Sequence, residues 1–376
     1  MKRLLTALSL LGLAWAASPI ELTPESDLQA VIAGAEPGAV LVLAPGVYSL
    51  SKGILIDRSL TLSGAGSDKT EIISSAPEYL IKVIGSDTDW VTEGLTFSHT
   101  GDDWADVVLL QDAKGKFRDI AFSGAHSNRA EQQADAEAPN RGGRGLVLSG
   151  RASGQLESVL ASDNDLFGMA VEDEAHLDLN RSTLRGNGSV GIVFAGSSGG
   201  TMSHTLVENH PSHGVVVSGE SDPLLEGNTL RANARLGILC EGNASGTARA
   251  NLSEGNSIGI SVAGKATPLL EGNTLHDNGL TGIFYSGAAA GIARGNTSDS
   301  NRSRGISVAG SATPLLEDNL LTGNLDLAII FSEDSKAKVS GNRCEKGGNY
   351  DFFVVAPSEP ELLENACEVM VAPLPE

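Results

Sequence analysis

The sequence has few positive charges. Its 26 lysines and arginines stand against 47 aspartates and glutamates, which gives a net charge of −21 over 376 residues. So acidic a chain is poorly suited to nucleic acid or anionic membranes, whose phosphates it would repel. After the first 16 residues it also lacks any apolar run long enough to span a bilayer. These absences exclude two classes of partner and predict a chain that stays monomeric in solution.

The first 16 residues have the pattern of a signal peptide. Lys2 and Arg3 precede an apolar run over residues 4–13, which is too short for a membrane helix. Residues 14–16 (Ala-Trp-Ala) form a small-x-small cleavage site. No cysteine follows that site, so a lipid anchor is not expected. We therefore expect export to a periplasm or to the medium, with residues 17–376 as the mature domain.

A Gly-apolar-x-apolar unit recurs through the second half of the chain. Its glycines follow one another at intervals of 23 residues, with a single interval of 22 between Gly237 and Gly259. A strict period of this length is typical of a solenoid, and alternating apolar residues bounded by turn residues indicate short strands. The unit opens at Gly145, Gly168, Gly191, Gly214, Gly237, Gly259, Gly282 and Gly305, with degenerate copies at Ala328 and Asp351.

Two apolar columns, one and three positions after each glycine, should face the inside of such a coil. They begin with Leu146 and Leu148 and continue to Phe352 and Val354. Stacked rungs would lie about 4.8 Å apart, as hydrogen-bonded strands do, and crossovers between parallel strands are nearly always right-handed. The sequence therefore predicts an all-β fold, a single-stranded right-handed parallel β-helix with about 23 residues per rung.

Two asparagine columns and one charge column support this register. Asparagine tolerates left-handed backbone, and stacked amides bond to one another along an axis, so we interpret both asparagine columns as turn ladders. In the charge column the sign alternates from rung to rung, although exposed pairs contribute only about 0–1 kcal/mol each. The ladders are Asn228, Asn251, Asn273, Asn296, Asn319, Asn342, Asn365 and Asn164, Asn187, Asn233, Asn256, Asn278, Asn301, Asn324; the charges are Glu226, Arg249, Glu271, Arg294 and Glu317.

The remaining chain divides around the regular rungs, which we place at residues 145–367. Residues 36–124 form irregular but continuous rungs. Residues 125–144 form an Ala/Gln/Glu-rich insertion without periodic apolar residues, which we expect to leave the coil as a loop. Thr23-Pro24-Glu25 is typical of a helix start, so a short helix should cap the open N-terminal end of the coil.

The opening of the mature chain resembles that of pectin-lyase-like β-helix proteins. The resemblance rests on the runs Asp27-Leu28-Gln29-Ala30, Leu43-Ala44-Pro45-Gly46-Val47-Tyr48 and Leu60-Thr61-Leu62-Ser63-Gly64. The rungs from Gly145 to Asn342 look like the carbohydrate-binding and sugar-hydrolase type of repeat. Together these cover nearly all of the mature chain and imply a β-helix with a polysaccharide groove along its side. They do not imply one activity, since this fold hosts lyases, hydrolases, esterases, epimerases, adhesins and non-enzymes.

The catalytic motifs of enzymes with this fold are missing. The outward position inside each Gly-apolar-x-apolar unit carries neither a carboxylate nor a base; this strip is mostly apolar, either covered or a sticky surface. The paired-aspartate, Gly-His-Gly and Arg-x-Lys motifs of polygalacturonase-like hydrolases are absent, and Gln111-Asp112 is a weak match to pectin methylesterases. We therefore expect a secreted polysaccharide-binding module. A polysaccharide lyase or glycoside hydrolase with a non-standard site, and a structural or adhesive surface protein, remain as alternatives.

One cluster of candidate catalytic residues lies in the irregular rungs. Asp102 and Asp103, with His99, Trp104 and Asp106 nearby, offer two carboxylates and an aromatic platform for a sugar. Acid–base cleavage of a glycosidic bond needs such a carboxylate pair. The alternative is that Asp102 and Asp103 form a solvated turn.

Two further groups could hold a metal ion. One rung carries five carboxylates, and Ca²⁺ prefers six to eight oxygen ligands; an exposed acidic edge is the alternative. Three histidines within ten residues suggest a second group, but spacing alone does not show convergence, so no metal is assigned to either. The carboxylates are Asp163, Asp165, Glu172, Asp173 and Glu174, of which Glu172 and Asp173 are also candidate catalytic acids, and the histidines are His204, His210 and His213.

The three cysteines have two different predicted roles. Cys344 and Cys367 stand 23 residues apart in one column, so their Cα atoms should lie about 5 Å apart, within disulfide range, in an oxidising compartment. We predict a disulfide that pins the C-terminal rung, with two buried thiols as the alternative. Cys240 replaces Val or Phe in an inward column and should be a core residue rather than a nucleophile.

Overall fold

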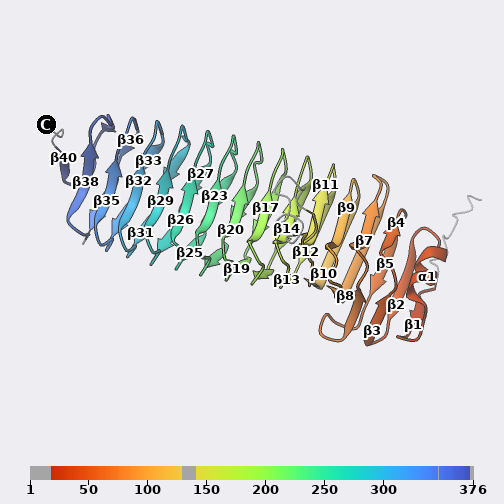
Figure 1. Cartoon of the computed structure of the whole chain (residues 1–376). Coiled ribbons are helices and arrows are strands. Elements are labelled where there is room, and N and C mark those ends of the chain that lie inside the picture. The colour runs from red at the N-terminus through yellow and green to blue at the C-terminus, as the bar shows by residue number, and fades with distance from the viewer. Residues whose placement is uncertain (1–17, 129–140, 346, 373–376) are drawn as a thin grey trace, which may run out of the picture.

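The computed structural model describes residues 18–128, 141–345 and 347–372 and shows a right-handed parallel solenoid whose rungs stack into one long rod (Figure 1). The signal-peptide prediction for residues 1–16 and most of the predicted insertion lie outside the described residues. Within the described ranges, no helix is long and apolar enough to cross a membrane.

Each rung after the first, from residue 39 onward, contributes one strand to a 14-stranded parallel sheet. In the regular part each rung also contributes two short strands to a 26-stranded parallel sheet. The strands of the 14-stranded sheet are β4 (Ile54–Ile56), β7 (Glu78–Ile84), β9 (Ala105–Gln111), β11 (Arg144–Ser149), β14 (Phe167–Val171), β17 (Val190–Phe194), β20 (His213–Val217), β23 (Leu236–Cys240), β26 (Ile258–Val262), β29 (Thr281–Tyr285), β32 (Arg304–Val308), β35 (Leu327–Phe331), β38 (Tyr350–Val355) and β40 (Val369–Ala372).

The 26-stranded sheet bends at a turn between the two strands of each regular rung, while β8 and β10 run through that bend. Its strands are β1 (Ile20–Leu22), β2 (Ala39–Leu43), β3 (Gly46–Leu50), β5 (Leu60–Ser63), β6 (Thr70–Ser74), β8 (Asp89–His99), β10 (Lys114–Ser123), β12 (Ser153–Glu157), β13 (Leu160–Ser162), β15 (His176–Asn180), β16 (Thr183–Arg185), β18 (Gly199–Ser203), β19 (Leu206–Glu208), β21 (Leu224–Glu226), β22 (Thr229–Arg231), β24 (Thr247–Arg249), β25 (Leu252–Glu254), β27 (Leu269–Glu271), β28 (Thr274–His276), β30 (Ile292–Arg294), β31 (Thr297–Asp299), β33 (Leu315–Glu317), β34 (Leu320–Thr322), β36 (Lys338–Ser340), β37 (Arg343–Glu345) and β39 (Glu361–Leu362).

The interior confirms the predicted register. Ile260 pairs with Ile283, and Ile283 with Ile306, in successive strands of the 14-stranded sheet. All three side chains are fully buried. Burial of a side chain of this size stabilises the fold by about 1.5–3 kcal/mol, and the repeat multiplies that gain along the rod.

The asparagine ladders are confirmed as well. Asn273 shows the pattern: its Oδ1 accepts from Asn251 Nδ2 at 2.9 Å, and its Nδ2 donates to Asn296 Oδ1 at 2.9 Å. A second bond from Asn273 Nδ2, at 2.8 Å, satisfies the Ala248 carbonyl oxygen. The ladders thus satisfy buried amide and turn groups that would otherwise be costly.

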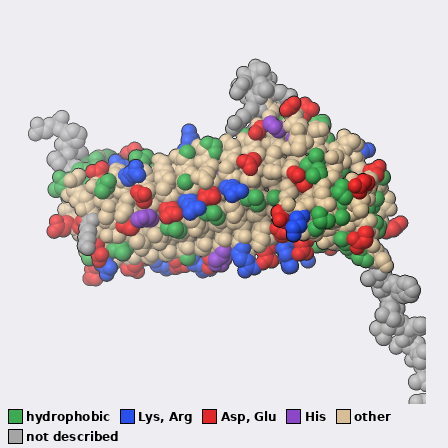
Figure 2. Space-filling model, turned by 90° about the horizontal axis from the view of Figure 1, so that it is seen from below, with side chains coloured by type: hydrophobic (Ala, Val, Ile, Leu, Met, Phe, Trp, Pro, Cys, Tyr) green, Lys and Arg blue, Asp and Glu red, His purple; other side chains and the backbone are tan. Residues whose placement is uncertain are grey.

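The exposed charge column is paired as its alternation predicted. Arg249 Nη2 lies 2.6 Å from Glu226, and Arg294 Nη2 lies 2.7 Å from Glu271. Figure 2 shows acidic and basic side chains side by side along the length of the molecule.

A short helix, α1 (Leu28–Gly34), lies at the N-terminal end of the solenoid, where Leu28 and Ile32 are buried in the core (Figure 1). Its predicted start was wrong by one turn. Thr23 opens a separate turn closed by the Ser26 amide, and Asp27 is the N-cap, with its Oδ1 accepting from the Ala30 amide at 3.0 Å. The Asp27 carboxylate satisfies a free helix amide, so the helix begins after it.

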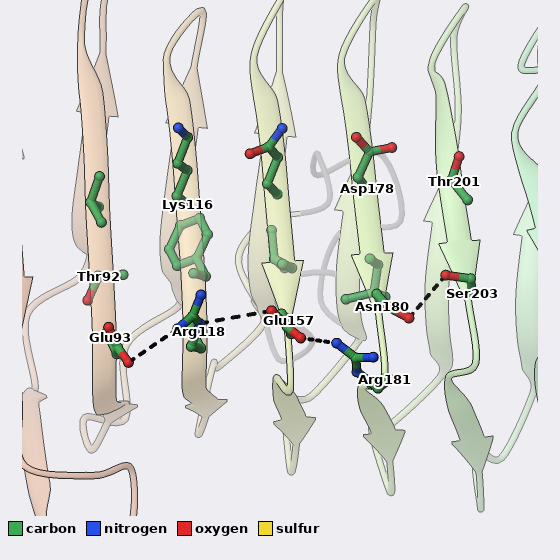
Figure 3. A pocket seen from close by; sticks show the side chains of 15 residues that line it. Thr92, Glu93, Lys116, Arg118, Glu157, Asp178, Asn180, Arg181, Thr201 and Ser203 are labelled. Atoms are coloured by element: carbon green, nitrogen blue, oxygen red, sulfur yellow. Dashed lines mark hydrogen bonds and ion pairs between the residues drawn. The ribbon is translucent and has the colours of Figure 1, made fainter.

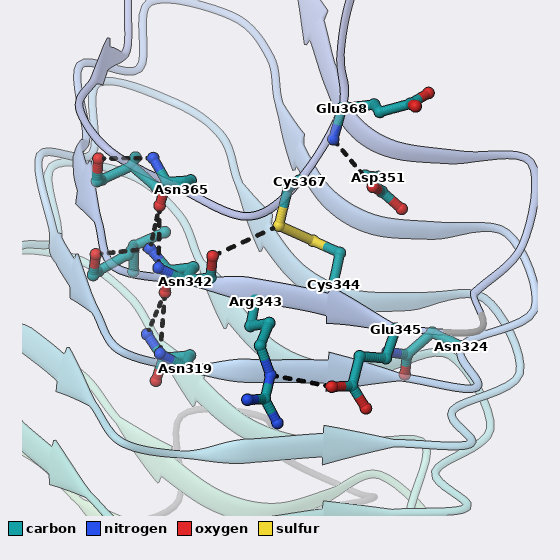
Figure 4. Close-up of a disulfide and its surroundings, with 12 residues drawn as sticks. Asn319, Asn324, Asn342, Arg343, Cys344, Glu345, Asp351, Asn365, Cys367 and Glu368 are labelled. Atoms are coloured by element: carbon teal, nitrogen blue, oxygen red, sulfur yellow. Dashed lines mark hydrogen bonds and ion pairs between the residues drawn. A yellow bond between two sulfur atoms is a disulfide. The ribbon is translucent and has the colours of Figure 1, made fainter.

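At the other end, Cys344 and Cys367 form a disulfide with a Cα–Cα distance of 5.1 Å (Figure 4). It joins β37 to the segment between β39 and β40, beside the last members of one asparagine ladder. Cys240 is a free, buried cysteine in β23.

Candidate functional site

An open groove of about 590 Å³ crosses the outward face of β8, β10, β12, β15 and β18 (Figure 3). These strands pair in parallel register, so residues at equivalent positions form rows along the solenoid axis. The upper row is Val91, Lys116, Gln155, Asp178 and Thr201, and the lower row is Glu93, Arg118, Glu157, Asn180 and Ser203.

Ion pairs link several side chains of the lower row. Arg118 lies between Glu93 and Glu157, at 3.9 Å from each carboxylate, and Arg181 donates to Glu157. The hydrogen bond and charge of Arg181 hold the pKa of the Glu157 carboxyl below its ordinary value. These groups form one wall of the groove, visible as the chain of dashed lines in Figure 3.

The side chains of the upper row make fewer ion pairs within the protein. Lys116 and Gln155 are exposed, and within the described part of the chain no acidic side chain comes within ion-pair distance of Lys116. Asp178 lies 3.4 Å from His176. The row therefore presents an ammonium, an amide, a carboxylate and the Thr201 hydroxyl to solvent from successive rungs.

A second hollow of about 330 Å³ widens the groove beyond this row. It shares Lys116, Gln155 and Asp178 and adds Lys114 and His176 from the first positions of β10 and β15. The groove is thus three side-chain rows wide at these strands.

The candidates predicted around Asp102 lie elsewhere, at the corner between the end of β8 and the start of β9. Asp102 and Asp103 are exposed on a bend, as in the alternative of a solvated turn. His99 is buried, its Nε2 lies 3.0 Å from the Ala76 carbonyl oxygen, and burial lowers its pKa. These positions do not place His99 on a surface open to a sugar.

Two neighbouring candidates are already in contact with arginines. The Arg141 guanidinium lies 5.5 Å above the Trp104 ring. Asp106 is only 2% exposed and accepts two bonds from the Arg144 guanidinium, at 2.9 and 2.7 Å, and one from its backbone amide, at 3.1 Å. Despite the cost of its burial, bonds to Asp106 and Glu172 raise the pKa of the Arg144 guanidinium, so the group is a buried ion pair.

The five carboxylates considered for Ca²⁺ do not converge. Strand β14 separates Asp165 from Glu172; Asp165 accepts from the Ser127 amide at 3.0 Å, and Glu172 pairs with Arg144 at 3.1 Å. Asp173 accepts from the Gly150 amide at 2.8 Å, while Asp163 and Glu174 are exposed. Among the described residues, no three His, Cys, Asp or Glu side chains form a group that could hold a metal ion.

The three histidines considered as metal ligands also lie in separate environments. His204 is exposed, and His213 begins β20, where burial lowers its pKa. His210 takes the place of an asparagine in a ladder: its Nδ1 lies 2.9 Å from Asn233 Oδ1 and its Nε2 lies 3.1 Å from Asn187 Nδ2. The gap in that asparagine column is therefore filled by an imidazole.

One His–Asp pair suited to acid–base chemistry was not predicted from the sequence. His126 Nδ1 lies 3.2 Å from Asp165 Oδ2, and the His126 side chain is 44% exposed. Antiparallel bridges from Ala105 to His126 and from Ser127 to Gly142 hold this corner. A carboxylate that orients an imidazole in this way is an arrangement used for acid–base catalysis.

The groove residues were also missed, although the sequence carried a signal for them. Residues 114–118, Lys-Gly-Lys-Phe-Arg, place three cations at alternating positions in an otherwise acidic chain. Alternation of this kind indicates one face of a strand. What it could not indicate was the neighbour: Lys116 pairs with Gln155, 39 positions further along the chain.

The outward strip of the 14-stranded sheet exposes less apolar side-chain surface than an adhesive surface would. Val147, Ala170 and Ile330 are at most 9% exposed, and Leu239 and Phe284 are half-buried. These side chains therefore offer little apolar surface to a partner, which weakens the adhesive alternative.

Comparison with known proteins agrees with the fold. Among curated proteins, none matches the sequence significantly. The fold is similar to the crystal structure of the periplasmic alginate epimerase AlgG (TM-score 0.60, 15% identity, 87% of this chain and 83% of that one). It is also similar to the A-module of the Azotobacter vinelandii mannuronan C-5 epimerase AlgE4 (0.60, 18%, 88% and 94%) and to the Dettilon tailspike protein (0.58, 14%, 89% and 68%).

The sequence itself matches one protein family. The family described as the right handed beta helix region matches residues 134–267 and 247–369, together more than half of the chain. By this match, the protein belongs to the right-handed β-helix family.

Proposed function

We propose that this protein is a secreted polysaccharide-binding protein and that a segment of sugar chain lies in the groove, parallel to the solenoid axis. The observation that carries the proposal is the upper row, whose polar side chains repeat once per rung over an open groove of about 590 Å³. Two of the structures with a similar fold are named as epimerases of alginate and of mannuronan, which supports a polysaccharide as the ligand.

Binding fits the groove better than cleavage does. Hydrolysis of a glycosidic bond needs one carboxylic acid that holds its proton near neutral pH, which requires a raised pKa. Glu157 has the opposite shift, because Arg181 stabilises its carboxylate. Glu93 likewise faces Arg118 at 3.9 Å. Both acids of the lower row therefore act as partners of arginines.

The test is calorimetry of the protein without residues 1–16 against a panel of oligosaccharides, followed by variants. Lys116→Ala and Gln155→Ala should each weaken binding about tenfold, since a hydrogen bond to a ligand is worth roughly 1.4 kcal/mol. Thr247→Ala is the matched control, because Thr247 occupies the same outward row at β24, outside the groove. Equal losses in all three variants, or no binding across the panel, would contradict the proposal.

A second candidate function, acid–base catalysis, is favoured by the pairing of His126 with Asp165. If this pair transfers protons to or from a sugar chain, the protein should shorten or epimerise a polysaccharide, and His126→Gln should abolish that activity. Size-exclusion and proton NMR of treated polymers would detect either product. The groove variant Lys116→Ala should bind less polymer but keep the chemistry. Unchanged polymers throughout the panel would exclude this candidate.

A further inference from the structure

The charged side chains that line the groove balance one another. The lining of its larger hollow contains three basic groups, from Lys116, Arg118 and Arg181, and three acidic groups, from Glu93, Glu157 and Asp178. The second hollow adds Lys114 and Asp89, which pair with each other at 3.9 Å. The groove is therefore neutral, whereas the whole chain has a net charge of −21.

Both arginines are already used in ion pairs. Arg118 contacts two glutamates, and Arg181 donates to one of them. A ligand carboxylate that approached these arginines would also meet Glu93 or Glu157 as like charges. The lower row together with Arg181 thus offers no net positive charge to an anionic polymer.

Lys116 is the one basic side chain of the lining for which the described residues provide no ion pair, and it stands alone in its row. Asp178 lies two rungs further along the same row, after Gln155, at a distance of about 9.6 Å from the rung spacing. This is close to the Debye length of about 8–10 Å in physiological salt. Along this row, a polymer with a carboxylate on every sugar would meet one unpaired cation, then a fixed anion, in a strongly acidic protein.

An uncharged sugar finds better partners in the same row. Lys116 donates hydrogen bonds, Asp178 accepts them, and the Gln155 amide does both. Sugar hydroxyls also donate and accept, so they can satisfy each of these groups. The rungs are spaced at about 4.8 Å, close to the length of one pyranose residue, so successive rungs can contact successive sugars.

From this balance we infer that the groove selects an uncharged polysaccharide and discriminates against polyuronates. The inference rests on the proposed function and adds to it the chemical class of the ligand. It also separates this protein from the similar structures named for alginate and mannuronan.

The experiment uses pairs of oligosaccharides that differ only at C6, such as a β-1,4-linked mannohexaose and the corresponding mannuronate hexamer. Kd is measured by calorimetry at low and high NaCl, in EDTA and in Ca²⁺. We expect the neutral member of a pair to bind at least tenfold more tightly, with a Kd that salt does not change. Tighter binding of a uronate member under any of these conditions would overturn the inference and leave the proposed function intact.

The variant Asp178→Asn provides a test that does not depend on which pair of oligosaccharides is chosen. Asp178→Asn keeps an acceptor for a sugar hydroxyl and removes the fixed anion, so uronate binding at low salt should improve relative to binding of the neutral ligand by the same variant. No gain in uronate binding would contradict an electrostatic origin of the selectivity. Binding of neither member in any pair would contradict the proposed function itself.

Discussion

At the scale of single residues, His210 shows how a ladder can accept a foreign side chain. Asn233 presents its Oδ1 to His210 Nδ1 at 2.9 Å, and Asn187 presents its Nδ2 to His210 Nε2 at 3.1 Å. The imidazole therefore fits as the neutral tautomer with its proton on Nδ1. A second proton on Nε2 would face the Asn187 amide donor, so the ladder disfavours the charged ring.

This geometry leads to a prediction about acid stability. Burial lowers the pKa of His210 in the folded protein, whereas the unfolded chain takes up the proton at about pH 6.5. The unfolded state therefore binds more protons below this pH, and the free energy of unfolding falls as the pH falls. Between pH 7 and pH 5, the free energy of unfolding of His210→Asn, which restores the amide, should fall less than that of the unmodified protein, by no more than about 2 kcal/mol. Thermal unfolding followed by circular dichroism measures the difference.

The exposed His204 supplies the control. His204→Asn, at a position with left-handed backbone (φ 49°) that asparagine also tolerates, should leave the pH dependence unchanged. His99 and His213, whose pKa values burial also lowers, act in the same direction in every variant. If His210→Asn and the unmodified protein lost equal stability on acidification, the ladder interpretation of His210 would be wrong.

At the scale of elements, the last rung is the least supported part of the rod. Among the described strands, β40 pairs only with β38, and Leu363, Val369 and Met370 are 41–58% exposed. Few apolar contacts hold this rung, so the disulfide should hold it instead. In the double variant Cys344→Ser/Cys367→Ser, we expect the backbone amides of β38–β40 to exchange faster with deuterium. The free energy of local opening should fall by up to about 3 kcal/mol. Exchange in β26 should not change, and equal exchange in β38–β40 would contradict the prediction.

Thiol counting gives an independent check of the same elements. Burial raises the pKa of the Cys240 thiol to about 12, so the folded protein should take up no alkylating reagent. After denaturation without reductant one label should appear, on Cys240. Labels on Cys344 or Cys367 under that condition would show that the disulfide does not form.

The elements also show which parts of the fold the sequence could predict. In the regular rungs, counting 23 residues from Ile260 reaches its neighbour Ile283, so the periodicity alone predicts columns, ladders and the Cys344–Cys367 pair. The groove lies where the rungs vary in length, and the neighbour of Lys116 cannot be counted. The His126–Asp165 and Asp106–Arg144 pairs were missed for the same reason, since each joins one end of the predicted insertion, residues 125–144, to a segment outside it.

At the scale of the whole molecule, each rung contacts mainly its two neighbours, so whole rungs should be removable. One exposed charge column alternates in sign, which gives the rod a repeat of two rungs, and a second column begins with an opposite-charge pair. Glu226, Arg249, Glu271 and Arg294 form one column, and Arg231, Glu254, His276 and Asp299 occupy equivalent positions in the neighbouring strands.

Deletions of one rung and of two rungs should therefore differ in the charges that meet at the new junction. Deleting residues 259–281 keeps the strand register but stacks Arg249 on Arg294 and Glu254 on Asp299, which are like charges. Deleting residues 237–281 stacks Glu226 on Arg294 and Arg231 on Asp299, which are opposite charges. Since each exposed pair is worth about 0–1 kcal/mol, a change from low salt to 1 M NaCl, where the Debye length falls to about 3 Å, should affect the two proteins in opposite ways. Relative to the full-length protein, screening should raise the unfolding temperature of the one-rung deletion by weakening repulsion, and lower that of the two-rung deletion by weakening attraction. Equal salt dependence of the two deletions would show that the charge alternation does not contribute to the register.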